Sequence, residues 1–102
     1  MAEMTIFDEA TGESFPTIWH ALFDDPAEIA SLQMRSELME NIRRRVDSWG
    51  VTQTEAAGRL SITQPRLNSL LRGNINRFSV DSLISIAVKA GLSVSIELKD
   101  AA

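Results

Sequence analysis

Residues 52–72 have the sequence TQTEAAGRLSITQPRLNSLLR, which predicts two short helices joined by a tight turn. Thr52 and Glu55 have the spacing of a capping box, in which both side chains bond to free amides at the start of a helix. Thr63 can cap a second helix. Pro65 is tolerated there, because the amides of a first helical turn have no partner within the helix. The stretch therefore favours a helix, a turn and a second helix.

Apolar side chains in this stretch fall on one side of each expected helix. The inward-facing positions are apolar in both: Ala56, Ala57, Leu60, Leu67, Leu70 and Leu71. The outer side of the second helix is polar instead, with Gln64, Pro65, Arg66, Asn68, Ser69 and Arg72. A helix of about eight residues, a turn of about three and a second helix with a polar outer side form the helix-turn-helix arrangement, whose second helix enters the major groove of DNA.

The polar side chains of the second helix suit the edges of DNA bases. Gln and Asn pair with the N6 and N7 edge of adenine, and Arg pairs with the O6 and N7 edge of guanine. We therefore expect the base-reading residues to be Gln64, Arg66, Asn68 and Ser69. Phosphate contacts fix the register of a protein on DNA. The candidates for such contacts are Gln53, Thr63, Arg72 and Arg77.

Acidic and basic side chains are segregated along the chain. The net charge is −4, which by itself argues against a nucleic-acid partner. Residues 1–41 hold nine acidic side chains and one basic, whereas residues 42–90 hold eight basic and three acidic. The basic segment contains the predicted motif, as expected of a surface that contacts phosphates. A solvated face would also explain this run of charge, so both interpretations stay open.

A long helix is predicted before the motif. Residues 25–28 supply an Asp cap, a Pro at the first helical position and a Glu at the third. Apolar positions then recur at helical spacing as far as Trp49, and Gly50 can end the helix with a left-handed backbone. Residues 43–45 are three consecutive arginines. They either contact phosphates or form a solvated helix turn, and both alternatives stay open.

The N-terminal segment, residues 1–24, is acidic and carries several aromatic side chains. Phe15, Trp19 and Phe23 share one face of a short helix that their spacing predicts. This face either packs on the chain's own long helix or contacts a partner protein.

The C-terminal part of the chain predicts a helix followed by a strand. The helix starts at the Ser79 cap and runs to Gly91, and residues 92–99 then alternate apolar and polar side chains. Residues 5–7 are only a weak candidate for a second strand. A solitary strand leaves its backbone groups unpaired. We therefore expect pairing with the same strand of a second subunit, in a homodimer that buries Leu92, Val94, Ile96 and Leu98.

Several classes of function are disfavoured by the residues that the sequence lacks. There is no cysteine, and the single histidine, His20, belongs to no cluster of the kind that zinc requires. No nucleophile stands beside an activating base, and there is no glycine-rich phosphate loop. We therefore expect no enzyme activity, no metal site and no cofactor. The lack of a long apolar run and of a secretory signal predicts a cytoplasmic protein without membrane contact.

Residues 43–99 resemble the Xre/Cro-type helix-turn-helix proteins. The matching elements are Thr52-Gln53 with Ala56-Ala57, Gln64-Pro65-Arg66, Leu70-Leu71-Arg72-Gly73, and Phe78-Ser79 with Leu83. Within this family the chain is similar to the HigA-like antitoxins of toxin-antitoxin modules. Ser61 departs from the family, which commonly has glycine in the turn. Glycine suits the turn because a non-glycine residue with positive φ is strained. Gly58 costs about 1 kcal/mol relative to alanine inside a helix, and we expect close helix packing to explain it.

The resemblance implies a mainly α fold, a lambda-repressor-like helix-turn-helix bundle over residues 25–91. Residues 92–102 are then the dimerisation strand and tail that the alternation predicts. The resemblance also implies a protein that binds operator DNA, represses its own operon and neutralises a partner toxin. Residues 1–24 would then be the toxin contact, because such toxins are typically basic. A stand-alone regulator without a toxin and a protein-interaction module that does not bind DNA remain the alternatives.

Overall fold

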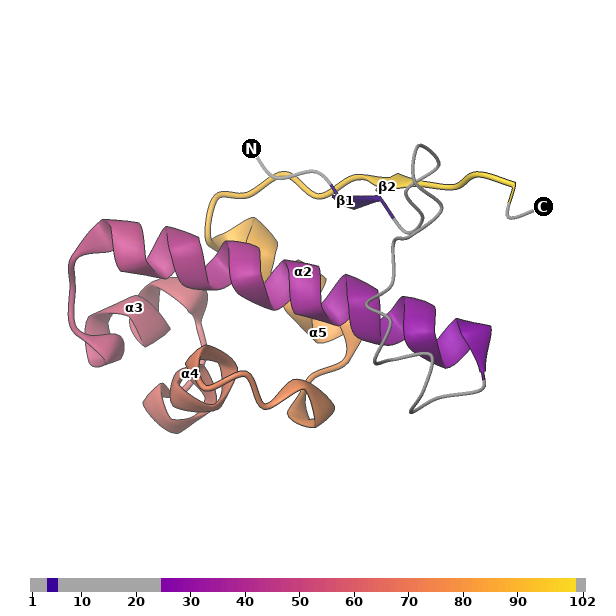
Figure 1. Cartoon of the computed structure of the whole chain (residues 1–102). Helices are drawn as coiled ribbons and strands as arrows, with labels where there is room; N and C mark the ends of the chain where they lie inside the picture. Colours follow the sequence, from indigo (N-terminus) through magenta and orange to yellow (C-terminus); the bar gives the residue numbers. More distant parts are fainter. Residues whose placement is uncertain (1–3, 6–24, 101–102) are drawn as a thin grey trace.

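The computed structural model describes residues 25–100 and the backbone of residues 4–5. The described chain is mainly helical, with α2 (Pro26–Trp49), α3 (Gln53–Leu60), α4 (Gln64–Leu71), the 3-10 turn η1 (Ile75–Arg77) and α5 (Val80–Lys89), besides two short strands, β1 (Met4–Thr5) and β2 (Ile96–Glu97). Figure 1 shows α2 along the length of the molecule, with α3 and α4 on one side of it and the strands on the other. The helix predicted around Phe15, Trp19 and Phe23 lies outside the described residues.

Helix α2 begins and ends where its capping residues predict. The Asp25 side chain accepts a hydrogen bond from the Ala27 amide at 2.9 Å, and Pro26 occupies the first helical position. Gly50 ends the helix with φ 62° and ψ 34°, a left-handed conformation that favours glycine. The 24 residues of α2 span about 36 Å. The helix is therefore long enough to pack against α4, η1 and α5 along one side.

The predicted helix-turn-helix is confirmed as α3, a turn and α4. The hydroxyl oxygens of Thr52 and Thr63 cap the two helices, each accepting a hydrogen bond from the amide three residues later at 3.2 and 3.3 Å. Ser61 makes the turn with φ 58° and ψ 39°. This left-handed conformation costs a non-glycine residue about 1–2 kcal/mol. The turn lets both helices direct a fully buried leucine, Leu60 or Leu67, into the same core.

The core is one apolar cluster shared by α2 and the three shorter helices. Its largest fully buried side chains are Ile42, Leu60, Leu67, Leu70 and Leu83. Burial of one such side chain contributes about 1.5–3 kcal/mol. Phe78 and Leu83 belong to this cluster and lie on either side of the Ser79 cap, where Ser79 and Ser82 form a reciprocal capping box. The core therefore fixes α3 and α4 relative to each other.

The three consecutive arginines of α2 make contacts within the chain. Arg43 and Arg44 pair with Glu40 at 2.7 and 3.1 Å. Hydrogen bonding to the Arg43 guanidinium lowers the pKa of the Glu40 carboxyl. Arg45 donates to the Ala90 carbonyl at the end of α5, at 2.9 Å. The exposed pairs of Arg43 and Arg44 with Glu40 fit the solvated helix turn, whereas Arg45 holds the end of α5.

The explanation expected for Gly58 is wrong. This glycine is exposed on α3, and a Cβ built on it would meet no atom within 4 Å. Close helix packing therefore does not require glycine at this position.

We expect Gly58→Ala to raise the free energy of unfolding by about 0.5–1 kcal/mol, because alanine costs less backbone entropy in a helix and meets no neighbour. The melting temperature should rise by about 2–8 °C. Gly50→Ala is the matched control, since the same change at φ 62° should lower the stability. A lower melting temperature for Gly58→Ala would show that the glycine has a structural role after all.

The C-terminal strand differs from its prediction in length and in partner. Regular strand is confined to Ile96–Glu97, which pair in parallel with Met4–Thr5 of the same chain. The expectation of a strand over residues 92–99 that lacks a partner in its own chain is therefore wrong. Leu92, only 9% exposed, joins the helical core, and Val94 packs against it. Because these side chains pack on the helices, the segment begins to form a strand only at Ile96.

Candidate nucleic-acid interface

Three amide side chains, Gln53, Gln64 and Asn68, form a hydrogen-bonded group where α3 meets α4. The Oε1 atom of Gln53 accepts from Nε2 of Gln64 at 2.6 Å and from Nδ2 of Asn68 at 3.4 Å. Gln64 and Asn68 are four residues apart, so they lie one above the other on the same side of α4. All three side chains are half-buried. The structure thus brings together one predicted phosphate-contacting residue and two predicted base-reading residues.

These hydrogen bonds orient the amides without using all of their donors and acceptors. Gln64 and Asn68 each use one N–H, so each keeps a carbonyl oxygen and a second N–H. One donor and one acceptor are what the N7 and N6 groups of adenine require. Gln53 keeps its own NH₂ group as a donor for a phosphate oxygen. The group is therefore prepared to read bases from α4 and to hold the backbone from α3.

Arg66 lies away from the amide group, on the side of α4 that faces the start of α5. Its guanidinium carbon lies 4.4 Å from the centroid of the Phe78 ring, within the range of a cation–π contact. The stacking leaves the N–H groups at the edge of the guanidinium for hydrogen bonds. Gln64 and Arg66 are about 200° apart around the helix axis, so the base-reading candidates do not share one face.

Ser69 lies on a third line along α4. It follows Pro65 by four residues and precedes Arg72 by three, so the three share one side of the helix. The Asn74 side chain donates to Ser69 Oγ at 3.5 Å. Sequence reasoning did not single out Asn74 or the stacking of Arg66 on Phe78. The spacing of eleven residues between Gln53 and Gln64, each at the start of a helix, was the available signal for the amide group.

The remaining phosphate candidates are exposed around the two helices. Thr63, which caps α4, is exposed, as are Arg72 at the end of α4 and Arg77 in η1. Among residues 25–100, the ion pairs engage Arg43, Arg44, Arg59 and Lys99, and they leave out Arg66, Arg72 and Arg77. The surface beside α4 is therefore positively charged and is not neutralised by neighbouring carboxylates of the described chain.

Comparison with known proteins agrees with this geometry. A family model described as a helix-turn-helix domain matches residues 22–99, which is most of the chain. The chain belongs to this helix-turn-helix family. A solved structure named as an XRE family transcriptional regulator matches with a TM-score of 0.64 and 26% identity, over 69% of this chain and 79% of that chain. No curated protein gives a significant match.

The chain is thus a helix-turn-helix protein similar to an XRE family transcriptional regulator, and α4 is the second helix of the motif, the one that enters DNA in helix-turn-helix proteins. The Xre-type resemblance inferred from the sequence is confirmed at this level. The HigA-like subgroup is a finer assignment that neither comparison tests.

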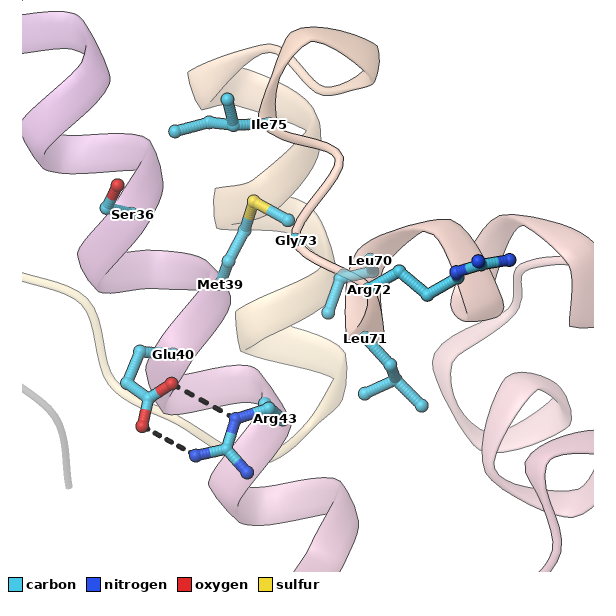
Figure 2. A pocket seen from close by; sticks show the side chains of 9 residues that line it. All are labelled: Ser36, Met39, Glu40, Arg43, Leu70, Leu71, Arg72, Gly73 and Ile75. Atoms are coloured by element: carbon cyan, nitrogen blue, oxygen red, sulfur yellow. Dashed lines mark hydrogen bonds and ion pairs between the residues drawn. The ribbon is translucent and has the colours of Figure 1, made fainter.

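A hollow of about 270 Å³ lies between α2 and the end of α4 in this helix-turn-helix protein. Figure 2 shows Glu40 and Arg43 paired on its α2 side, while the Arg72 side chain points away from it. The charges of Glu40 and Arg43 neutralise each other, so they give the hollow no net charge that would attract an ion. The Arg72 side chain stays exposed, where it can contact a phosphate.

Two other kinds of site are absent from the part of the chain that the structure describes. Within residues 4–5 and 25–100, no three His, Cys, Asp or Glu side chains gather closely enough to hold a metal ion. None of the helices in this part combines the length and the apolar character that a membrane span requires.

Proposed function

We propose that this regulator is a repressor that recognises a specific operator through α4 and controls its own operon. The observation that carries the proposal is the amide group of Gln53, Gln64 and Asn68. A helix-turn-helix that served only as a packing motif would have no need for three oriented amides on its outer surface. We assign Gln64 and Asn68 to base reading, whereas Arg66 lies on nearly the opposite side of α4 and Ser69 lies between the two sides.

Phosphate contacts supply the affinity in this proposal. Gln53, Thr63, Arg72 and Arg77 surround α4, and the helix N-termini add partial positive charge. Each phosphate that is neutralised adds about −0.9 to the slope of log K against log salt concentration. We therefore propose that binding weakens steeply with salt and that the protein acts in the cytoplasm, where its DNA is.

We further propose that the regulator binds DNA as a homodimer, because helix-turn-helix dimers use two half-sites about 34 Å apart. A single α4 of eight residues reads only one of them. Linking two such contacts raises the affinity without adding any new contact.

The finer proposal is that the regulator is the antitoxin of a toxin-antitoxin module. It is supported by the resemblance to HigA-like antitoxins and by the acidic composition of residues 1–24, where Phe15, Trp19 and Phe23 are the candidate contacts. Coexpression with the product of the adjacent gene tests it. A stable complex that restores growth would support the antitoxin. A neighbour that neither binds nor harms growth would favour the stand-alone regulator.

Fluorescence anisotropy tests autoregulation. The protein is titrated into labelled DNA from upstream of its own gene and into random DNA, each at two salt concentrations. We expect selective binding that weakens with salt. Equal binding to both DNAs would contradict autoregulation, and binding to neither would support the protein-interaction module.

A further inference from the structure

Arg35 is a half-buried arginine of α2 whose side chain hydrogen-bonds to backbone carbonyls outside its own helix. Its Nη1 atom donates to the Ile75 carbonyl at 3.0 Å and to the Phe78 carbonyl at 3.5 Å. These two carbonyls stand at the start of η1 and directly after its end. Among residues 25–100, the ion pairs do not include Arg35. Its guanidinium therefore serves the backbone of residues 75–78 instead of a carboxylate.

Residues 75–78 connect the end of α4 to the start of α5 and have few polar contacts of their own. No side chain caps η1 at Asn74, and the Phe78 amide donates to the Ile75 carbonyl at a long 3.4 Å. A hydrogen bond from a charged donor is about twice as strong as a neutral one. Arg35 is therefore the main polar restraint on the path of this segment.

Two basic side chains depend on the path of residues 75–78. Arg77 is exposed within η1, between the two carbonyls that Arg35 holds. Arg66 of α4 stacks on the ring of Phe78, with its guanidinium carbon 4.4 Å from the ring centroid. A shift of the segment would therefore move Arg77 directly and would remove the ring that supports Arg66.

Arg66 lies on the side of α4 that is turned away from the amide group. It is about 200° from Gln64 around the helix axis, so the two side chains do not reach the same bases. Phosphates border the groove on both sides of a helix that enters it, and the planar fork of arginine matches their oxygens. Arg66 and Arg77 are both absent from the ion pairs of residues 25–100. Their place and their charge suit the backbone of DNA.

We propose that Arg66 and Arg77 form a second contact with the phosphate backbone of DNA, and that Arg35 is the positioning residue of this contact. The inference rests on the proposed function, because it requires α4 to lie in the major groove. It assigns Arg66, which the sequence predicted as a base reader, to the backbone. Arg35 acts through the carbonyls of Ile75 and Phe78 and does not itself touch DNA.

A double-mutant cycle between Arg35 and Arg77 tests the positioning role. The probe is a labelled duplex of random sequence, because a backbone contact carries no sequence information. Fluorescence anisotropy at two salt concentrations should show that Arg77→Ala weakens binding about tenfold and lowers the salt slope by about 1. In the Arg35→Met background the same change should weaken binding by about threefold or less, because Arg77 is already misplaced. Equal losses in the two backgrounds would overturn the proposal.

Arg72→Ala and Arg45→Met are the matched controls for this cycle. Arg72 is exposed at the end of α4, before the segment that Arg35 holds, so Arg72→Ala should weaken binding by the same factor in both backgrounds. Arg45 donates to the Ala90 carbonyl at 2.9 Å, so Arg45→Met removes the same kind of contact from the far end of α5. We expect Arg45→Met to bind DNA like the wild type. Equal weakening by Arg45→Met and Arg35→Met would reduce Arg35 to a general structural role and overturn the proposal.

Arg66→Ala tests the assignment of Arg66 to the backbone. It should weaken binding to random DNA and to DNA from upstream of the gene by the same factor, about tenfold. A loss on the upstream DNA alone would make Arg66 a reader of bases and would overturn this part of the proposal.

Amide hydrogen exchange of the free protein tests the restraint without DNA. The amides of Arg77 and Phe78 donate to the Asn74 and Ile75 carbonyls within the segment. Arg35→Met should speed their exchange about tenfold, because local opening loses one charge-assisted hydrogen bond of resistance. The melting curve by circular dichroism identifies a temperature at which the variant is folded. Unchanged exchange at both amides in the folded variant would overturn the positioning role.

Failure of this inference is distinguishable from failure of the proposed function. Equal losses for Arg77→Ala in both backgrounds, with selective binding of the upstream DNA by the wild type, would remove the positioning role and keep operator recognition. Coupled losses on random DNA, with no preference of the wild type for the upstream DNA, would keep the contact and remove autoregulation.

Discussion

Replacing Leu67 by alanine is expected to lower the free energy of unfolding by about 2–5 kcal/mol. Leu67 is fully buried and, together with Leu70, anchors α4 in the core cluster beside Leu60 of α3. The truncation removes apolar contacts and leaves a cavity that helices held by α2 can fill only in part. Urea denaturation followed by circular dichroism measures the loss.

Leu71→Ala is the matched control for Leu67→Ala. Leu71 stands one turn further along α4 and is only half-buried, so the same truncation should cost clearly less. Equal losses for the two variants would mean that α4 does not pack through Leu67, which would contradict the fold.

The second large effect is expected on DNA discrimination. Gln64→Ala and Asn68→Ala should each reduce the preference for the selected site over random DNA by about 5- to 150-fold, because each would remove a bidentate base contact worth about 1–3 kcal/mol. The two losses should not add, because both side chains donate to the same Gln53 oxygen. Competition titrations with labelled site and unlabelled random DNA measure the preference.

Arg72→Ala is the comparison that separates base reading from phosphate binding. It should weaken binding to all DNA alike and reduce the salt slope by about 1. Ser85→Ala, on the exposed side of α5, should leave both quantities unchanged. If Gln64→Ala and Asn68→Ala behaved like Arg72→Ala, the amide group would be a phosphate contact and not a reader of bases.

Local signals in the sequence predicted most of the helical fold. Asp25, Thr52, Thr63 and Ser79 are capping residues whose side chains hydrogen-bond within a turn, so neighbouring residues alone define the helix starts. The apolar spacing then identified the inner side of α3 and α4. These features depend on short sequence separations, which is why a single sequence was sufficient.

Pairings between distant residues could not be predicted in the same way. The parallel contact of Met4–Thr5 with Ile96–Glu97 joins the two ends of the chain, and two-residue strands leave no periodic pattern to detect. The alternation in residues 92–99 predicted a longer strand because Leu92 and Val94 fit both a strand face and the helical core. Tertiary packing decided between these two possibilities.

The candidate site was predicted as a set of residue types but not as an arrangement. The outer side of α4 identified Gln64, Arg66 and Asn68 as candidates. The contact of Arg66 with Phe78 and the sharing of Gln53 by two amides depend on how α3, α4 and the start of α5 meet in space. Periodicity within one helix carries no information about these contacts.

The central claim is that α4 reads a DNA sequence through Gln64 and Asn68. Selection from a pool of randomised duplexes tests it most directly, with the wild-type chain and the folded double variant Gln64→Ala/Asn68→Ala used side by side. We predict that the wild type enriches one motif and that the double variant retains salt-sensitive binding without enriching it. Enrichment of the same motif by both proteins, or of no motif by the wild type, would contradict the claim.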